Sequence, residues 1–250
     1  MLFLGQSDHL RVRLNIGNCM MKPFDYFDEI FCINLDRRPE RWELAQKEFD
    51  KLGILDKVTR YRAIVNSHAE KGCFESHLQC IFSARERGLD NVLIFEDDVA
   101  FLKCYDERKF EKSIEMLKSK EDWEFFYLGG LERRIKPRKT YNRLKKKWHG
   151  DYNEEFDYFM KCKSVGWAQS YAVRSTIFDR IWKDYNAGLW DTVNEKYNGK
   201  TGGADKYYQD ILCPTTYTCV PSFTSQYDVV SDLSRTRTNR SLRIGVNDNK

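Results

Sequence analysis

The sequence contains no apolar run that approaches the roughly 20 residues that a membrane-spanning helix needs. The apolar start of the chain is four residues long, and Asp8, Arg11 and Arg13 interrupt the stretch after it, which is unlike a secretory signal peptide. No two cysteines have the C-x-x-C spacing that many redox and zinc motifs share. We therefore predict a cytoplasmic protein without a transmembrane segment.

The eight cysteines are spread along the chain, several of them inside apolar runs, as Cys32 is within residues 31–35. This placement is typical of buried, reduced thiols. Together with the absence of a signal peptide, it predicts a reducing compartment and no disulfide framework.

The charges nearly balance, with a net charge of +4 over 250 residues, and this value does not by itself indicate a nucleic-acid-binding protein. The length suits a single α/β domain. We expect this domain to span residues 23–232. An N-terminal extension at 1–22 precedes it, and a polar tail at 233–250 follows it.

Short apolar runs alternate with segments of helical spacing. In the first half, strands are predicted at 31–35, 58–65, 91–95 and 125–128, and helices after Pro39, after Gly72 and around 110–117. In the second half, strands are predicted at 168–173 and 215–223, and helices at 176–183 and 205–212. The alternation in the first half predicts a mostly parallel sheet with helices on its faces.

A basic segment at 133–149 separates the two halves. It carries nine Lys or Arg residues between Arg133 and Lys147 and shows little periodicity. A solvated loop is one interpretation, and a surface for an anionic acceptor, a membrane or nucleic acid is another.

Three consecutive carboxylates, Glu96, Asp97 and Asp98, directly follow the apolar run at 91–95. Side chains at the end of a buried parallel strand lie at the carboxyl edge of the sheet, where ligands bind in open α/β folds. Adjacent carboxylates repel one another unless a cation or strong hydrogen-bond donors neutralise them. Their hard oxygen ligands suit Mn²⁺ or Mg²⁺, although an ordinary acidic turn would have the same sequence.

Besides the acidic motif, five other segments of the chain are informative, and the six occur in a fixed order along the sequence. They are INLDRRPERW at 33–42, GCFESHLQC at 72–80, VLIFEDDV at 92–99, FFYLGG at 125–130, GWAQSYAVR at 166–174 and DKYYQDIL at 205–212. Together they resemble glycosyltransferase family 25, which holds bacterial lipooligosaccharide and procollagen galactosyltransferases. The resemblance runs from about residue 30 to about residue 232.

The resemblance implies a GT-A-type α/β fold, with a Rossmann-like mixed sheet and helices on both faces. It also implies an inverting hexosyltransferase that uses Mn²⁺ or Mg²⁺ and a UDP-sugar, with galactose ahead of glucose as the sugar. The implied acceptor is a hydroxyl of a glycan, a lipid-linked sugar or a protein.

The resemblance also implies roles for individual residues of these motifs. Asp98 is expected to ligate the metal and Glu96 to meet the ribose or the metal, with Asp97 beside them. The remaining nucleotide-binding candidates are Asn34, Arg41, Ser76 and His77. An arginine suits a diphosphate because its planar fork donates two hydrogen bonds.

Asp205 is the candidate catalytic base, although a carboxylate at the start of a helix also serves as a simple cap. No histidine follows His149, so the C-terminal histidine ligand of many GT-A enzymes is missing. The third metal ligand is then expected to be Asp228, Asp232 or water.

Three rival interpretations assign a different function to the chain. His68, Cys73, His77 and Cys80 offer the atoms of a zinc site along one helix. A Mg²⁺-dependent phosphoryl transferase could use the acidic edge, but the chain lacks the G-x-x-x-x-G-K-[ST] phosphate loop. A non-catalytic domain could bind nucleic acid or another polyanion through 133–149.

Overall fold

A computed structural model describes residues 22–103, 105–133, 159–197, 203–220 and 222–227. The expected extension up to residue 21, the basic segment from residue 134 onward and the polar tail lie outside these ranges. No helix among the described residues is both long and apolar enough to cross a membrane.

The first half of the chain alternates strands and helices, as its apolar runs predict. Its elements are η1 (Pro23–Tyr26), β1 (Glu29–Asn34), α1 (Pro39–Lys51), η2 (Leu55–Lys57), β2 (Val58–Arg62), α2 (Ala69–Glu86), β3 (Asn91–Glu96), β4 (Val99–Phe101), α3 (Glu107–Lys118), β5 (Phe125–Tyr127) and β6 (Leu131–Arg133). Pro39 opens α1 because its fixed φ suits the first turn of a helix, where its missing N–H is not needed.

The second half adds more strands than the sequence predicted. Its elements are β7 (Phe159–Cys162), β8 (Ser164–Gly166), β9 (Ser170–Arg174), η3 (Ser175–Ile177), α5 (Phe178–Asn186), α6 (Leu189–Lys196), α7 (Gly203–Tyr207), η4 (Tyr208–Leu212), β10 (Thr216–Cys219) and β11 (Thr224–Gln226). The helix predicted at 205–212 is divided into α7 and a single π-helical turn, η4.

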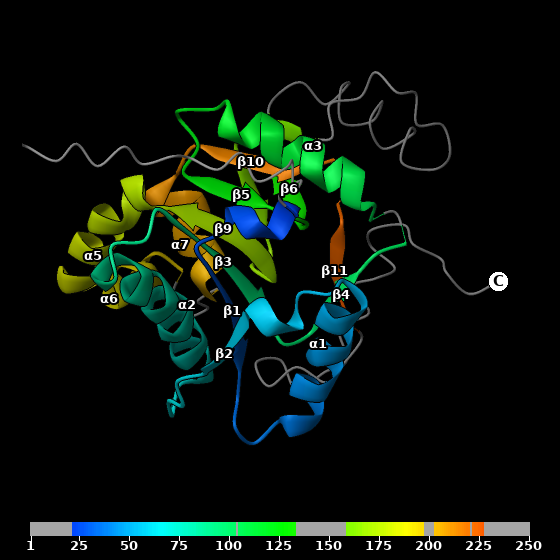
Figure 1. Cartoon of the computed structure of the whole chain (residues 1–250). Helices are drawn as coiled ribbons and strands as arrows, with labels where there is room; N and C mark the ends of the chain where they lie inside the picture. The colour runs from blue at the N-terminus through cyan, green and yellow to red at the C-terminus, as the bar shows by residue number, and fades with distance from the viewer. Residues whose placement is uncertain (1–21, 104, 134–158, 198–202, 221, 228–250) are drawn as a thin grey trace, which may run out of the picture.

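Seven strands form the central sheet in the order β2-β1-β3-β9-β5-β10-β7 (Figure 1). The pairs β1–β2, β1–β3 and β5–β10 are parallel, whereas β9 is antiparallel to both β3 and β5. Strand β7 is antiparallel to β10. Strands β1, β2, β3, β5 and β10 therefore run in one direction, as the prediction of a mostly parallel sheet requires, while β9 and β7 run the other way. The sequence did not predict that β9, from the second half of the chain, is inserted between β3 and β5. The predicted α/β class with a mixed sheet is confirmed.

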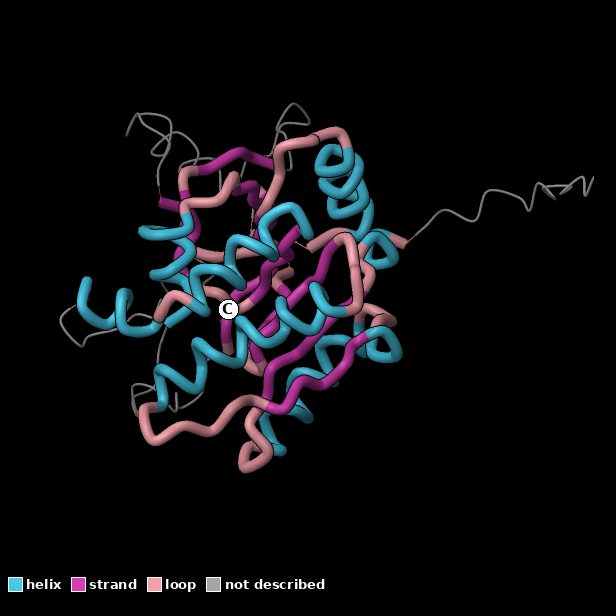
Figure 2. Tube along the Cα trace, turned by 90° about the vertical axis from the view of Figure 1, so that its left-hand side faces the viewer, coloured by secondary structure: helices cyan, strands magenta, loops and turns pink. Residues whose placement is uncertain are grey.

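The core has one apolar layer on each face of the sheet. In β3, Val92 and Ile94 face the layer covered by α2, α5 and α6, while Leu93 and Phe95 face the layer covered by α1 and α3. This alternation is the period of two that places successive strand side chains on opposite faces. Figure 2 shows helices lying on either side of the strands. Because both faces are covered, β3 is an unbroken apolar run until it reaches Glu96.

Strands β4 and β11 form a separate two-stranded sheet. Strand β11 pairs with β4, so Gln226 lies opposite Val99. The backbone N–H of Tyr227 donates to the carbonyl oxygen of Asp98 at 2.7 Å. The end of the described chain is thereby brought against the turn after β3.

Candidate functional site

Two parallel strands deliver polar side chains to one edge of the sheet. In the register of β1 and β3, Ile33 lies opposite Glu96, so Asn34 and the turn after Glu96 leave the sheet side by side. The predicted carboxyl-edge position of the three carboxylates is thus what the strand pairing produces.

Asp97 is the most enclosed of these carboxylates, with a relative exposure of 6%. The side-chain amide of Asn34 donates to Asp97 Oδ2 at 2.7 Å, and Arg41 forms an ion pair with Asp97 Oδ1. Arg60 in turn donates from Nε and Nη2 to the side-chain oxygen Oδ1 of Asn34. Burial raises the pKa of Asp97 above its ordinary value, although Arg41 and Asn34 act to lower it. Asn34 and Arg41 therefore hold Asp97 in place.

Asp98 and Glu96 are bridged by one side chain from the far end of the chain. The amide nitrogen of Gln226 lies 3.2 Å from Asp98 Oδ1 and 3.0 Å from Glu96 Oε2. Arg41 also reaches Asp98, with Nη2 at 3.1 Å from Oδ2. The two carboxylates thus converge on the position of one Gln226 amide group.

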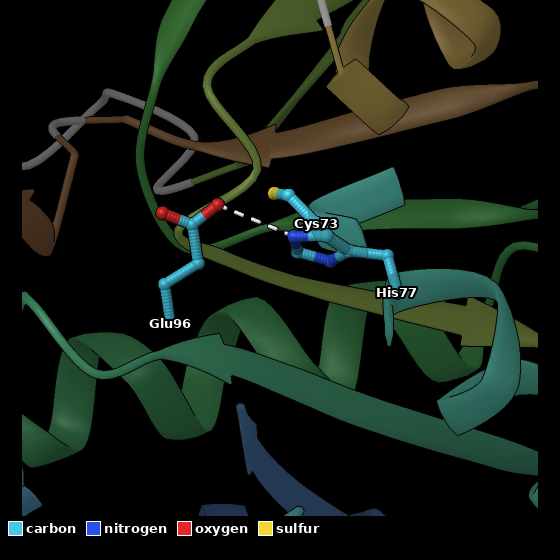
Figure 3. A group of neighbouring side chains, drawn as sticks. All are labelled: Cys73, His77 and Glu96. Carbon is cyan, nitrogen blue, oxygen red and sulfur yellow. Dashed lines mark hydrogen bonds and ion pairs between the residues drawn. The ribbon is translucent and has the colours of Figure 1, made fainter. Parts of the chain in front are cut away.

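Glu96 also faces helix α2. Its Oε1 lies 3.3 Å from Nε2 of His77 (Figure 3). Nδ1 of His77 lies 3.0 Å from the Tyr171 hydroxyl. Cys73 lies one turn before His77 on the same helix face, and its sulfur atom belongs to the same cluster. The histidine is buried, and its ring links β3 to β9.

Asp205 at the start of α7 lies near the same edge. Its Oδ2 lies 3.4 Å from both the Trp167 backbone nitrogen and the Gln209 side-chain amide. Burial raises the pKa of Asp205, and the charge of Glu96 adds to this rise. A carboxylate whose pKa moves towards neutrality is a suitable proton acceptor, as the candidate base requires.

Ser76 has a different environment from its neighbours. Its hydroxyl donates to the carbonyl oxygen of Gly72 at 2.7 Å and accepts from the backbone N–H of Ile64 at 2.8 Å. A Cβ atom on Gly72 would lie 2.5 Å from the Ile64 carbonyl oxygen, so only glycine allows this close approach. In the structure Ser76 joins α2 to the segment after β2, and its role towards a nucleotide stays a prediction.

The rival zinc set does not assemble as predicted. Among the described residues, the set of potential metal ligands is Cys73, His77 and Glu96, without His68 or Cys80. His68 packs against Trp190 at the start of α2, while Cys80 is fully buried in the core. The alternative third ligands of the carboxylate site, Asp228 and Asp232, lie outside the described residues.

The donor chemistry of the acidic edge fits a hard divalent cation. Glu96 and Asp98 supply oxygen atoms that already share one donor, and oxygen ligands are what Mn²⁺ and Mg²⁺ prefer. Asp97 is engaged by Asn34 and Arg41 and suits a supporting role. In the protein alone, Arg41 and Gln226 supply the strong donors that the three carboxylates need.

Residues 62–183 match the model of glycosyltransferase family 25, described as an LPS biosynthesis protein family. This part of the chain is similar to glycosyltransferase family 25. The predicted resemblance to this family is therefore confirmed. The family 25 region holds Cys73, His77 and the three carboxylates of the acidic edge. Asn34, Arg41, Asp205 and Gln226 contact or approach that region from outside it.

Curated relatives support the same assignment. Procollagen galactosyltransferase 2 of Mus musculus is 30% identical over a stretch that covers 58% of this chain and 29% of the relative. Inactive glycosyltransferase 25 family member 3 of Mus musculus is 33% identical over a stretch that covers 41% of this chain and 22% of the relative. The chain thus spans less than a third of the length of these relatives.

Among solved structures, the chain is distantly similar to a glycosyltransferase involved in the glycosylation of the major capsid of PBCV-1. It is 10% identical, covers 76% of this chain and 79% of its own, and has a TM-score of 0.46. This likeness is too low to carry an argument about the site. The family 25 region and the named relatives therefore support a glycosyltransferase, without assigning its sugar or its acceptor.

Sequence reasoning found six of the residues that the fold brings into direct contact: Asn34, Arg41, His77, Glu96, Asp97 and Asp98. It missed Gln226, which lies 128 positions from Asp98 in the sequence. It also missed Tyr171 and Arg60, which orient His77 and Asn34. No local motif marks Gln226 or Arg60, and Tyr171 lies within the segment 166–174 without any local sign of its contact with His77. Each of the three acts through a contact that only the tertiary fold creates.

Proposed function

We propose that this chain is an inverting, metal-dependent glycosyltransferase that moves a hexose, with galactose as the first candidate, from a UDP-sugar to a hydroxyl group. The observation that carries the proposal is the convergence of Glu96 and Asp98 on one Gln226 amide at the carboxyl edge of β3. A hydroxyl of a glycan, a lipid-linked sugar or a protein would be the acceptor. The cytoplasmic location expected from the sequence stays a prediction.

Glu96 and Asp98 would hold Mn²⁺ or Mg²⁺, with Asp97 keeping the turn in place. The bound ion would supply electrostatic stabilisation to the departing nucleoside diphosphate. For these oxygens to turn towards an ion, the Gln226 amide must move away from them. The contact that Arg41 makes with Asp98 must also loosen.

Arg41 would then have hydrogen-bond donors available to the diphosphate. It lies at the start of α1, directly beside the carboxylates, and its planar fork can bind two phosphate oxygens at once. Asn34 would keep its bond to Asp97 and so fix the edge against which the nucleotide lies.

Asp205 would accept the proton of the acceptor hydroxyl. As that oxygen forms a bond to the anomeric carbon, the bond from the anomeric carbon to the diphosphate breaks, and the proton ends on the Asp205 carboxylate. The raised pKa of Asp205 favours this transfer. Attack on the face opposite the leaving group inverts the anomeric configuration.

The names of the relatives include both a galactosyltransferase and a protein called inactive. Nucleotide binding and sugar transfer therefore need separate measurements. The first is a calorimetric titration of UDP into the protein with and without Mn²⁺. We expect Mn²⁺-dependent binding that Asp98→Asn abolishes while the circular dichroism spectrum is unchanged.

Asp179→Asn is the matched control, because the Asp179 side chain is 74% exposed on α5 and pairs with Arg85, away from the acidic edge. It should bind UDP like the unmodified chain. Absence of UDP binding in either condition, or full binding by Asp98→Asn, would contradict the proposal. If UDP binds, incubation with UDP-galactose and UDP-glucose then tests donor cleavage and transfer.

A further inference from the structure

We propose that Cys73, His77 and Glu96 form a binding site for one thiophilic divalent cation such as Zn²⁺. One ligand atom from each residue lies within 4.8 Å of the other two. Figure 3 shows the three side chains converging from helix α2 and strand β3. The set combines sulfur, nitrogen and oxygen, and it differs from the all-oxygen pair of Glu96 and Asp98.

The fold brings these ligands together from one helix face and one strand end. Cys73 and His77 are four residues apart on α2, a spacing that puts their side chains on one helix face. Gly72 allows α2 to approach the segment after β2 closely. Glu96 is the last residue of β3, directly beneath that face. The three ligand atoms lie up to 4.8 Å apart, so the side chains would draw closer together around a bound zinc ion.

The ring of His77 is oriented by a second hydrogen bond, as metal-binding histidines usually are. Its Nδ1 lies 3.0 Å from the Tyr171 hydroxyl, which lies 3.0 Å from the Tyr208 hydroxyl. A phenol can both donate and accept, so this chain of hydroxyls can serve either tautomer of the ring. When Nδ1 carries the proton, Nε2 presents a lone pair towards Cys73 and Glu96.

The charge around the thiol favours a cation. Burial is the largest cause that raises the pKa of Cys73, and the carboxylates of Glu96, Asp205 and Asp98 add to it. The same negative field that opposes a bare thiolate attracts a divalent ion. As the sulfur–metal bond forms, the thiol proton leaves to solvent.

The ligand types select the metal. Thiolate and imidazole ligands favour Zn²⁺ over Mn²⁺ and Mg²⁺, and three protein ligands leave a fourth position for water. The Glu96 side chain is 25% exposed, so solvent reaches the cluster at this residue. Because Glu96 belongs to both sets, a zinc ion here would compete with the cation of the proposed transferase site. That competition rests on the proposed function, whereas zinc binding does not.

The test is a titration of the full chain with Co²⁺ as a spectroscopic probe, in the presence of a non-thiol reductant. Cobalt bound to a thiolate shows a charge-transfer absorption band in the near ultraviolet. We expect this band to saturate at one equivalent and to disappear when Zn²⁺ displaces Co²⁺. Cys73→Ser should lose the band and bind Zn²⁺ at least about tenfold more weakly.

Cys80→Ser is the matched control, since Cys80 lies on the same helix but is fully buried in the core. Cys213→Ser, at the exposed cysteine, is a second control that leaves the core intact. Both should keep the band. Absence of the band in the unmodified chain, or its persistence in a folded Cys73→Ser, would overturn the proposal.

The two proposals fail separately. A chain that shows the thiolate band but never binds UDP retains the zinc site and loses the transferase function. A chain that binds UDP with Mn²⁺ but shows no thiolate band loses the zinc site alone.

Discussion

Arg41 Nη2 lies 3.1 Å from Oδ2 of Asp98, within the acidic edge of the sheet. Burial lowers the pKa of Arg41, but the charges of Asp98, Asp97 and Glu96 raise it by more, so the guanidinium stays charged. The side chain that we propose to bind a diphosphate is therefore also the cation that neutralises the candidate metal ligand. Metal and nucleotide should then bind together more favourably than either binds alone.

Replacement of Arg41 tests this dual role. Arg41→Gln leaves Asp97 and Asp98 without their ion pair, and we expect a loss of about 3 kcal/mol in the free energy of unfolding. Because Mn²⁺ can replace the missing charge, it should stabilise this variant more than the unmodified chain. Urea unfolding with and without Mn²⁺ measures both effects.

Arg85→Gln provides the control for Arg41. Arg85 pairs with the exposed Asp179 at 2.7 Å, so Arg85→Gln should lower the free energy of unfolding by about 1 kcal/mol or less. Mn²⁺ should not stabilise this variant more than the unmodified chain. If Mn²⁺ stabilised Arg41→Gln, Arg85→Gln and the unmodified chain equally, Arg41 would not be competing with a metal.

A third carboxylate at the Gln226 position should strengthen the metal site. Gln226→Glu replaces the shared amide donor with a negative group beside Glu96 and Asp98. We expect lower stability without metal, because like charges repel, and an increase in Mn²⁺ affinity of about tenfold. Isothermal calorimetry measures the affinity. Gln226→Met removes the amide without adding charge, and equal Mn²⁺ affinity in the two variants would rule out a metal beside Gln226.

The pH dependence of stability tests the environment of Asp205. Its folded-state pKa is raised by burial and by Glu96, so the proton is bound more tightly in the folded chain than in the unfolded chain. The protonated Asp205 carboxyl therefore makes its full contribution to the free energy of unfolding below pH about 4. This contribution is lost as the pH rises through the folded-state pKa. Asp205→Asn lacks this loss, so we expect it to gain stability relative to the unmodified chain as the pH rises from about 4 to about 8.

Urea unfolding of the unmodified chain and of Asp205→Asn across this pH range gives the difference between their free energies of unfolding. The contributions of other titrating groups cancel in this difference. The same variant should lose about 10²- to 10⁴-fold in sugar-transfer rate if Asp205 is the base. A stability difference that is constant with pH would contradict the buried, raised-pKa carboxyl. An unchanged transfer rate would remove Asp205 from catalysis.

Gly129 controls the position of β11. A Cβ atom at Gly129 would lie 2.2 Å from the carbonyl oxygen of Thr224, the first residue of β11. Gly129→Ala should therefore displace this strand and with it Gln226, at a cost of about 1–3 kcal/mol. We expect weaker Mn²⁺-dependent UDP binding, measured by calorimetry.

Gly188→Ala is the comparison for Gly129. Gly188 has a φ of +83°, and a Cβ atom there would meet no atom of the described residues within 4 Å. Alanine at this position therefore costs about 1–2 kcal/mol through backbone strain alone. It should leave UDP binding unchanged. Equal weakening by both substitutions would mean that global stability, and not the placement of β11, determines binding.

The sequence predicted elements whose side chains carry a clear period. The runs at 31–35, 91–95 and 125–128 correspond to β1, β3 and β5, and the helix after Pro39 corresponds to α1. Buried strands and amphipathic helices reveal themselves locally because each is defined by the spacing of its own apolar residues. Strand β4 and helix α6 were missed because both are short: β4 has three residues and α6 has eight.

The order of these elements in the sheet could not be predicted from the sequence. Residues 168–173 were correctly predicted to form a strand, but nothing within them specifies insertion between β3 and β5. The same limit applies to the site. Motifs located Glu96, Asp98 and His77, whereas the amide that joins the two carboxylates comes from a strand that pairs with only three residues of β4. Such contacts depend on the whole tertiary fold.

The insertion of β9 has a consequence for the order of events during synthesis. When the ribosome has made β1, β2, β3 and β5, the place between β3 and β5 is still unfilled, because β9 comes more than 40 residues later in the chain. The amide of Gln226 is made later still. The nascent chain can therefore present Glu96 and Asp98 before Gln226, the donor that they share, has been made, so a cation available in the surrounding solution can occupy its place first.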